Sequence, residues 1–98
     1  MIKATKCREP HTTATGAIQT LYRLDPPPRD ASDDGEPTTL EYVVVSALPL
    51  AFDHGEPETL IFRGNAEGEI ISFLGLPGSY RGAADADRAI RNAGWELA

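Results

Sequence analysis

The stretch TLEYVVVSAL, residues 39–48, most limits what this chain can fold into. Alternate residues of an extended strand point to opposite faces of a sheet. The side chains of one face are then Leu40, Tyr42, Val44 and Leu48, and those of the other are Val43, Val45 and Ala47. Both faces are apolar, which is typical of a strand in the middle of a sheet. The segment therefore predicts a central strand with apolar cover on both sides.

Other segments supply neighbours for this strand. Residues 17–24 alternate between apolar and polar side chains, as a half-buried strand does. Residues 58–64 and 68–75 are apolar runs joined by the short connection NAEG, which predicts a hairpin. Residues 2–7 are a weaker strand candidate.

A helix is expected near the end of the sequence, in DADRAIRNAGWEL. Asp85 is a good N-cap residue, and Gly94 stands where a helix enters a left-handed cap. Apolar residues recur at helical spacing between them, at Ala86, Ala89, Ile90 and Ala93. Trp95 then occupies the position that packs back on the helix in a glycine-capped motif.

These elements predict one domain over residues 1–98, of the α+β class: an antiparallel sheet of four or five strands with one short C-terminal helix packed on one face. The expected core is Ile18, Tyr22, Val44, Leu60, Phe62, Ile71, Phe73, Ile90 and Trp95. One short helix covers only part of one face. The second apolar face of the central strand needs another cover, and a homodimer would provide it.

The Pro- and Asp-rich stretch at residues 25–38 connects two predicted strands. Its three consecutive prolines favour an extended start, and the ASDDGE sequence that follows lacks apolar residues that would fix it to the body. We expect a loop within the domain, with a mobile tip.

The net charge of −6 is unevenly distributed. Residues 1–24 carry four basic and one acidic residue, whereas residues 25–41 carry one basic and six acidic residues. Direct nucleic-acid binding is not expected, because that affinity comes largely from Lys and Arg contacts to phosphate. No apolar stretch is long enough to cross a bilayer, and no apolar signal segment follows the N-terminus. A cytoplasmic protein that does not bind membranes is therefore expected, and the single cysteine agrees with a reducing compartment.

Chemical motifs are sparse. Cys7, His11, Asp53 and His54 are the only residues that suggest a metal site, and their spacing matches no known ligand pattern. The glycine-rich GLPGSYRG lacks the spacing of phosphate-binding loops. The sequence predicts no catalytic, cofactor or metal site. A small enzyme that uses Cys7 or His54 remains an alternative.

Four segments, EPETLIF, EGEI, LPGSYRG and RNAGWEL, together with the PHTTATG turn, give the chain a family likeness. In this order they resemble small uncharacterised proteins of mycobacteriophages and related actinobacterial genomes. The resemblance implies a phage accessory protein made in the cytoplasm of a bacterial host. Such proteins often bind a host protein, and some are toxic when overproduced.

The functional expectation is therefore a non-enzymatic accessory protein that binds a host protein. An alternative is an acidic decoy of a nucleic-acid-binding protein, which would use the carboxylates of residues 25–41 and 53–69. Residues of the types that anchor interfaces lie next to the predicted helix and on it. These candidate contact residues are Tyr80, Arg81, Arg88 and Arg91. The alternative interpretation is that Tyr80 packs over the helix start and the arginines are solvated.

Overall fold

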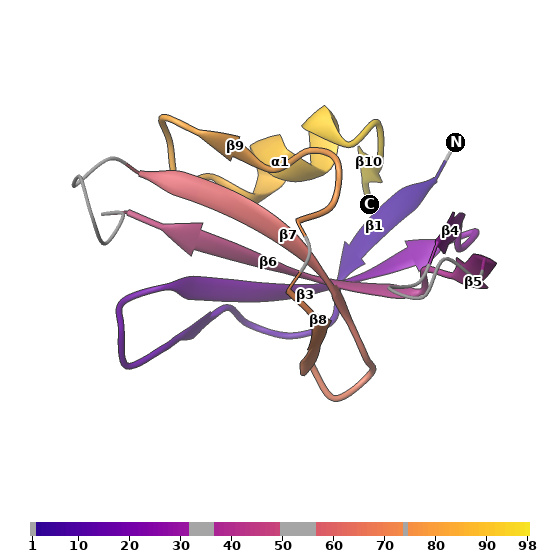
Figure 1. The fold of residues 1–98 in the computed structure, drawn as a ribbon, viewed down its shortest axis with the longest axis horizontal. Coiled ribbons are helices and arrows are strands. Elements are labelled where there is room, and N and C mark those ends of the chain that lie inside the picture. The colour runs from indigo at the N-terminus through magenta and orange to yellow at the C-terminus, as the bar shows by residue number, and fades with distance from the viewer. Residues whose placement is uncertain (1, 32–36, 50–56, 74) are drawn as a thin grey trace.

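A computed structural model describes residues 2–31, 37–49, 57–73 and 75–98 of the chain (Figure 1). The strands are β1 (Lys3–Lys6), β2 (His11–Thr12), β3 (Ile18–Asp25), β4 (Arg29–Ala31), β5 (Pro37–Thr39), β6 (Tyr42–Leu48), β7 (Glu58–Gly64), β8 (Ile70–Ser72), β9 (Tyr80–Arg81) and β10 (Glu96–Leu97), and the helix is α1 (Ala86–Asn92). The α+β class with one short C-terminal helix is confirmed.

The main sheet has the order β10-β1-β3-β6-β7-β8, with β2 also paired to β3 and β9 to β7. β6 lies between β3 and β7, as its two apolar faces predicted. The sheet is larger than the four or five strands expected. The additional strands β2, β9 and β10 have two residues each, which is too short to leave an alternating pattern in the sequence.

The helix begins and ends where its capping residues predicted. The Asp85 side chain accepts a hydrogen bond from the Arg88 backbone N–H at 3.2 Å. Gly94 has a φ of +89°, in the left-handed region that glycine adopts without strain. Beyond it, the Trp95 N–H donates to the Ile90 carbonyl at 3.2 Å. The chain thus turns back at Trp95 and enters β10.

The helix covers one face of the sheet, and Figure 1 shows α1 and β10 together on that side. Paired residues of neighbouring strands share a face, so Tyr22, Val43 and Val45 all point toward the helix. The buried cluster on this side consists of Ala4, Tyr22, Leu24, Leu40, Val43, Val45, Ile61, Ala89 and Ile90. We call this side the helix-covered face.

Tyr22 also connects the sheet to the helix by a polar contact. Its side chain is fully buried, and its hydroxyl donates to Asp87 Oδ1 at 2.8 Å. Burial, and then the nearby carboxylate of Asp87, raise the pKa of the Tyr22 hydroxyl above its ordinary value. The proton therefore stays on Tyr22 in the folded protein.

The opposite side of the sheet, which we call the far face, holds a second buried row. Leu21 pairs with Val44 and Val44 pairs with Phe62, and all three side chains are buried without a helix above them. A Cβ atom at Gly68, in the β7–β8 turn, would overlap the guanidinium of Arg8, which follows β1. These two segments follow strands that lie toward opposite edges of the sheet, so their contact shows that the sheet curls around this buried row. The row is therefore covered by other parts of the same chain.

Part of the predicted core is wrong. Ile18, Ile71 and Phe73 are 37%, 55% and 76% exposed. Val44 and Phe62 are buried, but on the far face and away from the helix. The error at residues 71 and 73 has a local cause. The pairing of β7 with β8 changes register between Arg63 and Gly64. Beyond such a shift, alternation along the short strand no longer predicts which side chains are enclosed.

The Pro- and Asp-rich stretch at residues 25–38 contains regular structure in its described part. β4 and β5 pair as a separate two-stranded antiparallel sheet. The Leu40 N–H donates to the Pro28 carbonyl at 2.7 Å and fixes the base of this hairpin to the start of β6. The predicted mobile tip was ASDDGE, residues 31–36. Its first residue, Ala31, ends β4, and residues 32–36 lie outside the described residues.

Candidate functional site

The structure brings two of the four predicted contact residues, Tyr80 and Arg88, together at the start of the helix. The guanidinium of Arg88 lies 4.9 Å from the centre of the Tyr80 ring, and the Tyr80 hydroxyl donates to the Asp85 carbonyl at 3.1 Å. Arg81 contacts Glu58, with 3.5 Å between Nε and Oε2. Contacts within the chain therefore involve Tyr80, Arg81 and Arg88. The alternative interpretation placed Tyr80 over the helix start in this way but expected the arginines to be solvated.

Arg91 lies in the last turn of α1 and is exposed. A cation at this end of a helix interacts favourably with the partial negative charge of the unpaired carbonyl groups. The side chain needs no partner molecule to explain it.

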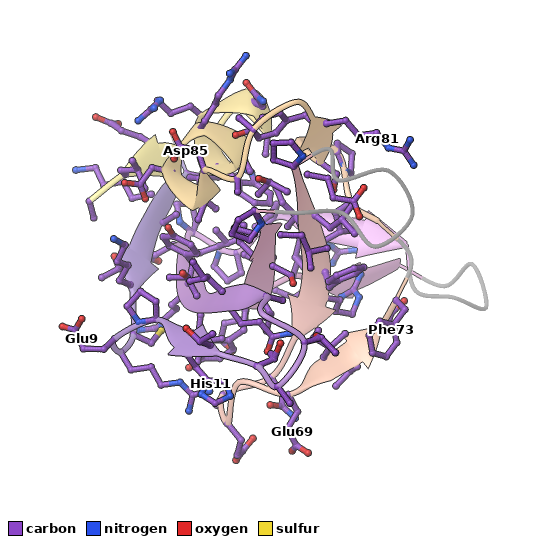
Figure 2. The ribbon with its side chains drawn as sticks, turned by 90° about the vertical axis from the view of Figure 1, so that its left-hand side faces the viewer. Glu9, His11, Glu69, Phe73, Arg81 and Asp85 are labelled. Atoms are coloured by element: carbon purple, nitrogen blue, oxygen red, sulfur yellow. The ribbon has the colours of Figure 1, made fainter. Side chains whose placement is uncertain are left out.

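A different surface contains the two most exposed large apolar side chains among the described residues. Ile71, in β8, and Phe73, directly after it, lie at the end of the main sheet, and we call them the apolar rim. Figure 2 shows Phe73 at the periphery of the molecule. The Phe73 ring packs edge-on against Phe62, with 5.5 Å between ring centres and 62° between the planes. Phe73 is thus exposed on most of its surface and contacts Phe62 with one edge of its ring.

Sequence reasoning placed the apolar rim in the core, because both residues are apolar and stand two positions apart. The length of the segment gave no warning, because the residues between Gly68 and Gly75 are enough for a strand of ordinary length.

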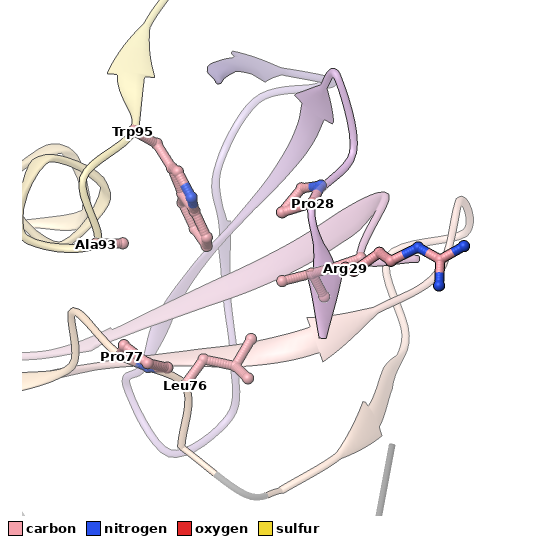
Figure 3. A pocket seen from close by; sticks show the side chains of 7 residues that line it. Pro28, Arg29, Leu76, Pro77, Ala93 and Trp95 are labelled. Carbon is pink, nitrogen blue, oxygen red and sulfur yellow. The ribbon is translucent and has the colours of Figure 1, made fainter. Parts of the chain in front are cut away.

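A pocket of about 140 Å³ opens between the end of α1 and the base of the β4–β5 hairpin (Figure 3). It is lined by Pro28, Arg29, Leu40, Leu76, Pro77, Ala93 and Trp95. Gly78 has a φ of +107°, and a Cβ there would lie 2.8 Å from the Ala89 carbonyl oxygen. The absence of that side chain lets the 75–79 turn approach the helix and form one wall.

The pocket is apolar inside and polar at its edge. In Figure 3 the indole of Trp95 and the ring of Pro28 stand on opposite sides of the opening. The stem of Arg29 lies at the edge, and its guanidinium points away from Trp95. Sequence reasoning missed this site, since its walls come from four separate segments of the chain.

The residues considered for metal binding or catalysis are not assembled into a site in the described part. Cys7 is exposed, and its thiol lies 3.7 Å from the Thr5 carbonyl oxygen. Among the described residues, no three His, Cys, Asp or Glu side chains are grouped as metal binding requires. Asp53 and His54 lie outside the described residues. Of the helices in this part of the chain, none has the length and apolar character needed to cross a membrane.

No family model, curated protein or solved structure matches the chain. The resemblance to mycobacteriophage proteins stays a prediction.

Proposed function

We propose that this protein is a non-enzymatic accessory protein that binds a host protein, and that the apolar rim is its main contact surface. The observation that carries the proposal is the state of Phe73, which is 76% exposed although Phe62 fixes its ring. Ile71, beside it, is 55% exposed.

Apolar groups of this size are favourable anchors for a partner protein. Burying a fully exposed Phe or Ile side chain contributes roughly 1.5–3 kcal/mol. An anchor that is already held in its bound orientation loses less conformational entropy on binding. The contact with Phe62 provides this orientation before any partner arrives. Adjacent exposed apolar residues on one surface are also a recognised mark of protein contact.

The surface around Tyr80 is a weaker candidate by the same criteria. Its aromatic ring is covered by Arg88, and Arg81 has an acidic partner in Glu58. A partner that used these side chains would have to replace contacts that the protein already makes. Only Arg91, of the four predicted contact residues, is exposed without such a contact in the described part of the chain.

The proposal is tested by affinity capture from host lysate with the wild-type protein, Phe73→Ser, and the double variant Tyr80→Ala, Arg81→Ala. We expect the wild-type protein to capture one partner that resists a high-salt wash. Phe73→Ser should reduce the amount captured at least about tenfold, whereas the double variant should capture as much as the wild type. Capture that depends on Tyr80 and Arg81 instead would move the contact surface there.

Two other outcomes would replace the proposal. Recovery of many basic nucleic-acid-binding proteins, all lost in high salt, would favour the acidic decoy. Elution of the purified protein as a dimer that Phe73→Ser converts to a monomer would identify a second copy of the chain as the molecule that covers the apolar rim.

A further inference from the structure

The pocket beside Trp95 has the properties of a second binding site, independent of the apolar rim. We propose that it binds a ring-sized apolar group that carries a carboxylate. The group can belong to a small free acid or to the C-terminal residue of a peptide, because both offer the same chemistry.

The size and walls of the pocket set the apolar part of the ligand. An apolar cavity of about 150 Å³ is known to hold a benzene molecule, and this pocket has about 140 Å³. A flat ring that enters between Trp95 and Pro28 can stack on the indole, which favours an aromatic group over a branched aliphatic one.

The walls are fixed by backbone hydrogen bonds before a ligand arrives. The Pro28 carbonyl accepts from the Leu40 N–H at 2.7 Å, and the Leu76 N–H donates to the Ile61 carbonyl at 2.8 Å. Little ordering is therefore needed on binding, which lowers its entropic cost.

The polar groups at the edge of the pocket set the charged part of the ligand. Among the described residues, Arg29 is the only charged one that lines it, and it forms no ion pair with any of the others. The indole N–H of Trp95 has no hydrogen-bond partner there either, and it is not enclosed. Both groups donate hydrogen bonds, and the Arg29 guanidinium, which points away from Trp95 in the free protein, turns toward the opening to meet a ligand that accepts them. A carboxylate accepts several and complements the guanidinium charge.

Trp95 is the only tryptophan of the chain, so its fluorescence reports on the pocket directly. The probes are 3-phenylpropionate and, as its uncharged counterpart, 3-phenylpropanol. The acetylated peptide Gly-Gly-Phe, with a free or an amidated C-terminus, represents the second source.

We expect saturable quenching by 3-phenylpropionate with a Kd on the order of millimolar. The alcohol should bind at least about threefold more weakly, and Arg29→Gln should remove that difference. Tighter binding of the free-carboxylate peptide than of 3-phenylpropionate would identify a peptide C-terminus as the better source, and the reverse order a small acid.

Two variants separate this site from the rest of the molecule. Ala93→Leu fills the pocket and should weaken 3-phenylpropionate binding more than about tenfold, whereas Phe73→Ser, on the apolar rim, should leave it unchanged. If Ala93→Leu does not fold, amide chemical-shift changes at Leu40, Leu76 and Ala93 in the wild-type protein locate the probe instead. Quenching that does not saturate, that survives in folded Ala93→Leu, or that is equal for acid and alcohol would overturn the proposal.

Discussion

The two faces of the main sheet are buried by different means. On the helix-covered face, Ile61 of the sheet and Ile90 of α1 are completely enclosed between the sheet and the helix. On the far face, Val44 and Phe62 are buried by the curl of the sheet, and the row ends at Phe73 in solvent. A helix can close a core on all sides, whereas a sheet that curls without meeting itself leaves an open edge. This difference explains why Ile71 and Phe73, the two most exposed large apolar residues of the described part, lie at the open edge.

The largest expected effect concerns two isoleucines with opposite environments. Ile61→Ala should lower the free energy of unfolding by about 2–5 kcal/mol, because it leaves a cavity under α1. Ile71→Ala, the matched control on the far side, should change it by less than about 0.5 kcal/mol. Urea unfolding followed by Trp95 fluorescence measures both. Equal losses would show that the apolar rim is part of the core.

The next effect tests the polar link that only the helix-covered face has. Tyr22→Phe removes the hydrogen bond to Asp87 and should cost about 1–2 kcal/mol at neutral pH. Asp87 is partly exposed, so its carboxylate regains water and is not left unpaired.

The same substitution predicts a pH dependence. The pKa of Tyr22 is raised in the folded state, so the unfolded chain loses this proton first as the pH rises. Its contribution to stability is therefore complete below the ordinary tyrosine pKa of about 10 and declines above it. The difference between wild type and Tyr22→Phe should shrink above pH 10 in urea titrations. A constant difference through that range would contradict the assignment of the raised pKa to Tyr22.

A smaller effect tests whether the two rings of the far face support each other. In a double-mutant cycle, Phe62→Ala and Phe73→Ala should show a coupling energy of about 0.5–1.5 kcal/mol. A coupling near zero would mean that Phe62 does not hold Phe73, and that Phe73 is not an oriented anchor.

The smallest effect is expected at the exposed ion pair between Arg81 and Glu58. Arg81→Ala should change the thermal midpoint very little, since such pairs contribute roughly 0–1 kcal/mol. A larger loss would give β9 a structural role that its two residues do not suggest.

The elements that the sequence predicted best are those whose signal is local. The central position of β6 follows from seven adjacent residues, and the boundaries of α1 follow from Asp85 and Gly94. The assignment of side chains to a face succeeded at Tyr22 and failed at Phe73, because the second depends on a register shift between strands that no single segment encodes. The pocket at Trp95 could not be predicted either, because it also depends on contacts between distant segments. Residues 28, 40, 76 and 95 meet only after the whole sheet has formed.

The parallel pairing of β1 with β10 has a consequence for how the chain reaches its folded state. Lys3 lies beside Glu96 and Ala4 beside Leu97, so β1 is synthesised long before the strand that covers its outer edge. Until residues 96–97 are available, the outer edge of β1 is an unpaired strand that can join another chain. Contacts between such distant parts of a sequence also form slowly, because the long intervening loop must close first. The period before this closure is when nascent chains are most prone to aggregate, and a chaperone that protects the β1 edge would act then.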